Sequence, residues 1–195
     1  MVDVRTLSVK KYFALESPHV AARAFWIATA TIVTAIAAQI EIPHQPVPYT
    51  FQTLVVILAG GLLGSKKGFL SMMAYLGLGA IGLPVFAGGG FGLARLMGPT
   101  GGYLLAFPVA AYLVGVLVSS RPESVAANSI LNTLWLFGTM TLGLFIIFVM
   151  GTVQLNVVYF HNWTSAVQSG FLIFSFWDVM KLLAATAIVR ELRKD

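Results

Sequence analysis

Hydrophobic positions in this chain gather into long uncharged runs, separated by short polar segments. A run of about 20 apolar residues predicts a helix that crosses a membrane. We expect six such helices, at about residues 24–40, 52–64, 68–83, 101–119, 131–155 and 166–189. The pattern predicts an all-α integral membrane protein with one domain, residues 1–195, in which residues 1–23 form a polar N-terminal segment.

The second and third runs are too short to cross the bilayer. At ~1.5 Å per residue they give helices of ~20 Å and ~24 Å, against ~30 Å of hydrocarbon. A segment with Pro43, Pro46 and Pro48 precedes the second run, and a glycine-rich segment follows the third. Non-helical backbone is tolerated at membrane depth only where protein or a cavity covers it. We therefore expect the outward loops between spans one and two, and between spans three and four, to dip over a ligand pocket.

The composition agrees with a membrane protein. Of the 195 residues, 58% are hydrophobic and 10% are charged, and the mean hydropathy is +0.87. A signal peptide ending near Ala35-Ile36-Ala37 is the alternative for the first run, but the long lead-in and the later spans disfavour it. The absence of cysteine excludes disulfides and thiol nucleophiles. The net charge of +5 is explained by cationic loops, so we expect no nucleic acid partner.

The positive charges predict the orientation of the chain. If the loops alternate between the two sides, ten of the twelve Lys and Arg residues fall on one side: Arg5, Lys10, Lys11, Arg23, Lys66, Lys67, Arg121, Arg190, Arg193 and Lys194. Cationic residues near spans accumulate on the cytoplasmic side. We expect a multi-pass protein of a bacterial cytoplasmic (inner) membrane with both termini in the cytoplasm. The two exceptions are Arg95, in an outward loop, and Lys181, within span six.

Asp178 lies three residues before Lys181, so the two side chains share one face of a helix. Ionisable groups at membrane depth usually face a cavity or one another. One interpretation is a pair that only neutralises itself and fixes helix packing. If Arg95 reaches the same cavity, the site carries one surplus positive charge and suits a ligand with one carboxylate. The alternative for Arg95 is a loop arginine that binds lipid headgroups.

Motifs for catalysis are absent from the sequence. It contains no G-x-G-x-x-G spacing between a predicted strand and a helix, no P-loop, no H-E-x-x-H and no G-x-S-x-G. We expect neither an enzyme nor a bound cofactor or metal. Gly60-x-x-x-Gly64 and Gly64-x-x-x-Gly68 predict close helix contacts, and Ala24-x-x-x-Ala28 predicts either internal packing or a docking face for a second membrane protein.

Three motifs occur in order between residues 39 and 103: P-V-P-x-T-x-Q-T-L, Gly-Leu-Pro-Val-Phe and Gly-Pro-Thr-Gly-Gly-Tyr. Together with Asp178-x-x-Lys181 they resemble the BioY family, the biotin-binding S component of energy-coupling factor (ECF) transporters. Phe176-Trp177 depart from the Pro-Gly that the family tends to have there. This departure concerns the start of the local helix and leaves the acid and the base in place.

The resemblance implies the six-helix ECF S-component fold and a subunit that captures biotin from the outside with high affinity for translocation into the cytoplasm. It also implies a complex in the lipid bilayer with a transmembrane coupling subunit and ATPase subunits, which alone would hydrolyse ATP. Ala24 and Ala28 would form the docking face for the coupling subunit. An S component for a different small anionic vitamin, a self-sufficient biotin facilitator, and a homo-oligomer are alternatives that the sequence leaves open.

Biotin combines a ureido ring, an apolar sulfur ring and an aliphatic chain that ends in a carboxylate. On this resemblance Asp178 accepts a ureido N–H, while Lys181 or Arg95 donates to the ureido oxygen or to the carboxylate. Neutral hydrogen-bonding candidates and aromatic wall candidates complete the predicted site: Thr50, Gln52 and Gln154, and Tyr49, Phe86, Phe91 and Trp177.

Overall fold

The computed structural model describes residues 19–172 and 176–193. Most of the predicted N-terminal segment, part of span six, and the cations Arg5, Lys10, Lys11 and Lys194 lie outside the described residues. The elements are α2 (Val20–Gln39), β1 (Glu41–Ile42), β2 (Tyr49–Thr50), α3 (Gln52–Leu63), α4 (Ser65–Ala80), the 3-10 turn η2 (Ala87–Gly89), α5 (Leu93–Met97), α6 (Gly101–Ser119), α7 (Glu123–Ala127), α8 (Ser129–Leu155), the π-helical η3 (Asn156–Phe160), α9 (Trp163–Ala166), the π-helical η4 (Val167–Phe171) and α10 (Phe176–Leu192).

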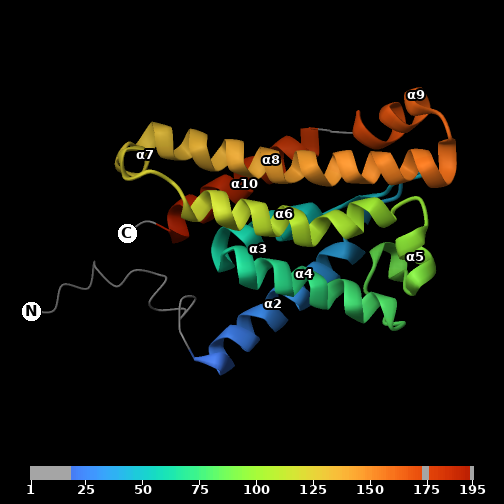
Figure 1. Ribbon diagram of the computed structural model, residues 1–195, viewed down its shortest axis with the longest axis horizontal. Helices are drawn as coiled ribbons and strands as arrows, with labels where there is room; N and C mark the ends of the chain where they lie inside the picture. Colours follow the sequence, from blue (N-terminus) through green and yellow to red (C-terminus); the bar gives the residue numbers. More distant parts are fainter. Residues whose placement is uncertain (1–18, 173–175, 194–195) are drawn as a thin grey trace, which may run out of the picture.

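The long helices lie side by side around α6, which packs against α3, α4 and α8 (Figure 1). α2 covers α3 and α4, and α10 packs on α3 and α8. Small residues allow the closest approaches, as the glycine pattern predicts. A Cβ on Gly60 would overlap the carbonyl oxygen of Ala111 on α6, and a Cβ on Gly68 would lie 3.0 Å from the Cα of Gly60. These contacts bring α3, α4 and α6 together at backbone distance.

Among the described residues, three helical stretches are long and apolar enough to cross a membrane: α2, α6, and α8 continued by η3 to Phe160. A fourth crossing is possible if α9 and η4 form one bent span with α10. α6 coincides with the fourth predicted span. α3 and α4 have only 12 and 16 residues, and both are short for a bilayer, as their runs predict. The chain is therefore a mostly helical, multi-pass membrane protein.

The structure differs from the predicted spans at both ends of the chain. α2 begins at Val20, so Arg23 lies in the helix and not in the preceding segment. The predicted span 166–189 is not one regular helix, because η4 has π-helical hydrogen bonding before residues 173–175. A contact with α6 fixes this segment: the hydroxyl of Tyr103 donates to the carbonyl oxygen of Gly170 at 2.8 Å.

The loop between α2 and α3 contains a small β-hairpin that the prolines did not predict. β1 and β2 pair antiparallel, with Glu41 opposite Thr50 and Ile42 opposite Tyr49. Pro43, Pro46 and Pro48 all lie between the paired residues, where a missing backbone N–H costs no ladder hydrogen bond. The segment is therefore compact and ordered across the end of the bundle.

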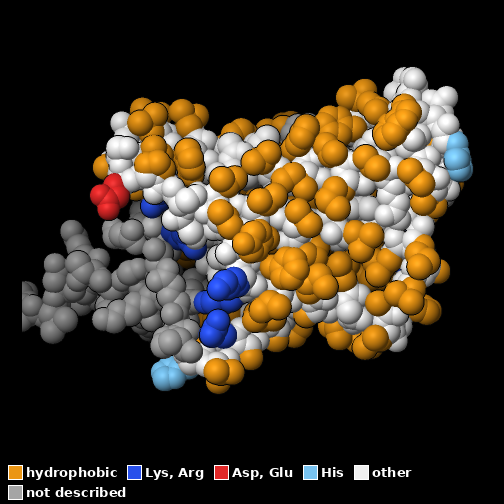
Figure 2. All heavy atoms as spheres, in the orientation of Figure 1, with side chains coloured by type: hydrophobic (Ala, Val, Ile, Leu, Met, Phe, Trp, Pro, Cys, Tyr) orange, Lys and Arg blue, Asp and Glu red, His pale blue; other side chains and the backbone are white. Residues whose placement is uncertain are grey.

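The two ends of the bundle differ in charge. One end, on the left of Figure 1, carries the start of α2, the α3–α4 turn, α7 and the end of α10. Figure 2 shows Lys and Arg side chains gathered toward this end and hydrophobic side chains over much of the remaining visible surface. We call it the cationic end. We call the opposite end, which carries the hairpin, α5 and α9, the hairpin end.

Candidate functional site

A cavity lies at the hairpin end, bounded by the hairpin, the loop from η2 to α5, and the helices α3, α6, α8 and α10. It holds about 640 Å³ of space free of protein atoms, including its open mouth. The lining residues are Val47, Pro48, Tyr49, Thr50, Gln52, Thr53, Phe86, Ala87, Arg95, Thr100, Tyr103, Leu104, Phe107, Ile147, Phe148, Asp178 and Lys181.

Asp178 and Lys181 form an ion pair in the wall of this cavity. The Nζ of Lys181 lies 3.0 Å from the Oδ1 of Asp178, and Lys181 and Asp178 are 8% and 1% exposed. Lys181 Nζ also donates to the hydroxyl of Thr53 at 3.4 Å and lies 6.0 Å from the centre of the Phe51 ring. Asp178 occupies the first turn of α10, where the helix dipole favours a carboxylate. Helix spacing thus places a buried acid and base together at the cavity.

Arg95 reaches the same cavity from α5, on the opposite loop. Its Nη2 donates to the carbonyl oxygen of Ala87 at 3.5 Å, and its side chain is half-buried. The charged residues of the cavity lining are therefore one acid, Asp178, and two cations, Lys181 and Arg95. The lining carries one surplus positive charge, and Arg95 contributes it.

A chain of neutral hydrogen bonds orders one side of the cavity. The hydroxyl of Thr50 donates to Gln52 Oε1 at 2.9 Å, and Gln52 Nε2 donates to the hydroxyl of Tyr75 at 2.6 Å. The Tyr75 hydroxyl donates in turn to the carbonyl oxygen of Val85 at 3.0 Å. These bonds tie the hairpin, α3 and α4 to the loop before η2. Thr50 and Gln52 line the cavity as predicted, and both also position its wall.

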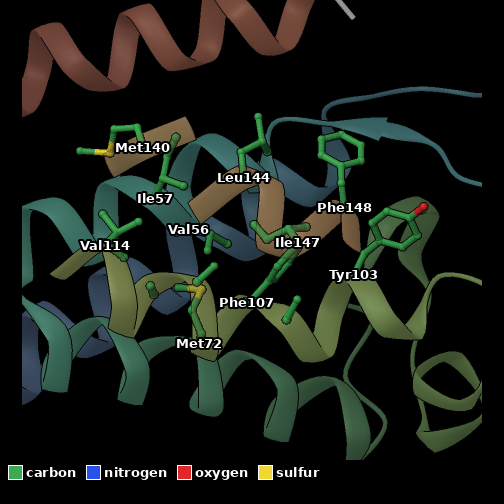
Figure 3. Packing of buried hydrophobic residues seen from close by; sticks show 14 of the residues in the cluster. Val56, Ile57, Met72, Tyr103, Phe107, Val114, Met140, Leu144, Ile147 and Phe148 are labelled. Carbon is green, nitrogen blue, oxygen red and sulfur yellow. The ribbon is translucent and has the colours of Figure 1, made fainter. Parts of the chain in front are cut away.

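Aromatic rings form much of the apolar lining. Phe86 is 0% exposed and packs edge-on against Tyr75, with ring centres 5.5 Å apart. Gly79 makes room for it, since a Cβ there would overlap the Phe86 ring. Figure 3 shows Tyr103 and Phe148 at one side of the packed core, and their ring centres are 6.2 Å apart.

Sequence reasoning selected Tyr49 and Phe86 but missed three lining aromatics, Tyr103, Phe107 and Phe148. Phe107 and Phe148 lie in uninterrupted apolar runs, where nothing marks which side faces a cavity. Tyr103 could have been identified from the sequence, because it ends the Gly-Pro-Thr-Gly-Gly-Tyr motif at the start of α6.

The structure does not bring three other candidates to the cavity. Gln154 donates from Nε2 to the carbonyl oxygens of Leu96 and Gly98, both at 2.8 Å, so it holds the connection between α5 and α6. Trp177 is 55% exposed and lines a separate apolar groove between the hairpin and α10. Phe91 is also exposed, at 60%. The carboxylate and the amine at positions 178 and 181 face inward, whereas the neighbouring Trp177 faces outward on the same helix.

The small residues of α2 divide between two faces. Thr34 is buried and its hydroxyl contacts the sulfur of Met72 on α4, so this part of α2 packs internally. Ala24 and Ala28 are exposed, on a helix that also exposes Phe25, Ile32 and Ile36. An apolar outer face of this kind is free within the described residues to contact lipid or another membrane protein.

Comparison with known proteins gives consistent matches. A family model described as "BioY family" matches residues 9–195. A protein of Thermotoga maritima named "Biotin transporter BioY" is 40% identical over 84% of this chain and 91% of its own length. The "Biotin transporter BioY2" of Lactococcus lactis subsp. cremoris is 35% identical over 85% and 89% of the two chains. A crystal structure described as "the S-component for biotin from an ECF-type ABC transporter" is similar with a TM-score of 0.78, 30% identity, and coverage of 89% of this chain and 91% of the other.

Proposed function

Because the chain belongs to the BioY family, we propose that it is the biotin-binding S component of an ECF transporter. The observation that carries this proposal is the cavity at the hairpin end, which is lined by Asp178, Lys181 and Arg95. Its relatives are named as transporters, and the known structure that it resembles is described as an S component for biotin.

The charges of the cavity match those of biotin. The Asp178–Lys181 pair sums to zero, so Arg95 supplies the surplus positive charge that a single carboxylate would neutralise. Asp178 is the one acid among the described residues of the lining and can accept a ureido N–H, while Lys181 or Arg95 donates to the ureido oxygen or to the carboxylate. The aromatic residues around them offer an apolar surface for the sulfur ring and the aliphatic chain.

We infer that the hairpin end faces outward. The described cations Arg23, Lys66, Lys67, Arg121 and Arg190 support this orientation, because all lie in segments at the cationic end and positive residues near spans accumulate in the cytoplasm. In a bacterial cytoplasmic membrane, both termini would then be cytoplasmic. Biotin would enter the cavity from outside.

The partners follow from the same assignment. We propose that a transmembrane coupling subunit docks on the exposed face of α2 that includes Ala24 and Ala28, and that ATPase subunits supply the energy. The subunit itself would use no cofactor. Co-purification from a membrane of the native cell, followed by mass spectrometry of the complex, tests the partners. An α2 variant with Ala24→Leu and Ala28→Leu should lose the coupling subunit and keep biotin.

Titration calorimetry of the purified protein in lipid nanodiscs tests the function. We expect one biotin to bind per chain, and thiamine and riboflavin to give no heat. Absence of biotin binding by folded protein would overturn the proposal, and binding of another vitamin instead would assign a different S component. Uptake of biotin by vesicles that contain this chain alone, without ATP, would favour a facilitator over a subunit.

A further inference from the structure

Gln39, the last residue of α2, contacts the turn between Phe86 and Gly90, which lies at the cavity. Its Nε2 donates to the carbonyl oxygen of Phe86 at 3.1 Å, and its Oε1 accepts from the backbone N–H of Gly89 at 3.1 Å. A single amide thus binds both arms of the turn between Phe86 and Gly90. These two contacts join segments about 50 residues apart in the chain, and no motif in the sequence assigned Gln39 a role.

The turn that Gln39 binds is closed by two backbone hydrogen bonds of its own. Phe86 N–H donates to the Gly90 carbonyl at 3.0 Å, and Gly90 N–H donates to the Ala87 carbonyl at 3.2 Å. Gly88 and Gly89 have φ angles of +64° and +69°, a conformation that costs glycine little but also leaves it free to change. The Gln39 amide restricts this backbone further, in addition to the buried Phe86 ring and the hydrogen bond from Arg95 to the Ala87 carbonyl.

The same turn builds the cavity. Phe86 and Ala87 line it directly, and the Ala87 carbonyl accepts the hydrogen bond from Arg95. Displacement of the turn would therefore move an aromatic wall residue and release a contact of the cation that supplies the surplus charge. Gln39 is not among the residues that line the cavity, so any effect on the ligand passes through Phe86 and Ala87.

We propose that Gln39 is a positioning residue that holds the Phe86–Gly90 turn against the cavity and thereby slows the release of bound ligand. This inference rests on the proposed function, because biotin is the ligand whose release is measured. The competing explanation is an ordinary helix end, since Gln39 Nε2 also lies 3.3 Å from the carbonyl oxygen of Ala35 in its own helix. A helix end of that kind would affect folding and not the release rate.

Dissociation of radiolabelled biotin separates the two explanations. The protein in nanodiscs is loaded with label, excess unlabelled biotin is added, and retained label is followed over time. Gln39→Met keeps the length of the side chain and removes both bonds to the turn. We expect label to leave at least about fivefold faster, because two hydrogen bonds are lost and one of typical net strength already corresponds to that change. Gln39→Glu keeps the acceptor for Gly89 N–H, so its release rate should fall between those of the Gln39→Met variant and the wild type.

Two controls make the outcome decisive. Gln168→Met changes an exposed glutamine of η4 in the same way and should leave the rate unchanged. Only protein that has bound biotin contributes to the rate, so a loss of folded protein cannot imitate the effect. An unchanged rate in Gln39→Met, with the wild type retaining label, overturns this inference alone. Failure of the wild type to retain any biotin overturns the proposed function instead.

Discussion

Replacing Asp178 and Lys181 together tests whether the buried pair serves the ligand or only the packing of helices. The single variant Asp178→Asn removes the carboxylate charge and leaves Lys181 charged and 8% exposed, with neutral acceptors only: the amide oxygen at position 178 and the hydroxyl of Thr53. Breaking a buried pair in this way typically costs ~3–5 kcal/mol. The double variant Asp178→Leu/Lys181→Met replaces both charges by apolar side chains of roughly similar shape, and such replacements are often neutral or stabilising.

Biotin affinity and thermal stability should not change in parallel across the single and double variants. A hydrogen bond to a charged group contributes about 1.5–3 kcal/mol, and ~1.4 kcal/mol is a tenfold change in Kd. We therefore expect the double variant to unfold near the wild-type temperature and to bind biotin at least tenfold more weakly. Each single variant should be both less stable and weaker in binding.

Thermal unfolding of the ligand-free protein in detergent measures the first quantity, and titration calorimetry measures the second. A double variant that is stable and binds biotin as the wild type does would refute the assignment of these residues to the ligand. The pair would then be a packing device, and the ligand site would have to lie elsewhere. Recovery of stability without recovery of binding supports the assignment.

Three further variants probe the cavity and its supports. Arg95→Met removes the surplus positive charge, so biotin should bind about tenfold more weakly in calorimetry, and an equal loss for biotin methyl ester would contradict a role with the carboxylate. Gly79→Ala would overlap the ring of Phe86 and should lower both thermal stability and biotin affinity, whereas Gly77→Ala, with no atom within 4 Å of its Cβ, should lower neither. Gln154→Ala removes the side-chain donor to the Leu96 and Gly98 carbonyls, of which Gly98 keeps its bond from Gly101 N–H, and should cost roughly 1–3 kcal/mol in a denaturation assay; an unchanged midpoint would contradict its role in holding α5 to α6.

The helices could be predicted because charged residues and glycines mark the ends of the apolar runs. α6 has the predicted bounds, since Gly101 opens its run and Arg121 follows its end. α3 and α4 are short for the reason read from the sequence: their runs stop at Gly64 and at the Gly82-Leu83-Pro84 segment. The π-helical η4 could not be predicted, because no local signal marks it and its bond to Tyr103 is a tertiary contact.

The charged part of the candidate site was also readable from the sequence. Ionisable residues are so costly within a span that Asp178, Lys181 and Arg95 stand out singly, and helix spacing pairs the first two. The apolar part was not readable, because α6 and α8 are apolar on every side and periodicity cannot say which face meets a cavity. Gln154 misled for a related reason: a polar side chain in a span suggests a ligand, yet here its partners are backbone carbonyls.

The packing between the cavity and the cationic end determines how cargo can travel. Ile57, Val114 and Met140 fill this part of the bundle, and none is more than 1% exposed (Figure 3). A protein interior packed at the density of an organic crystal leaves no water-filled path for a polar solute. The described bundle therefore has a cavity that is closed toward the cationic end, and no continuous channel. A molecule bound in the cavity crosses the membrane only if the helices around it separate or the whole subunit reorients in the membrane.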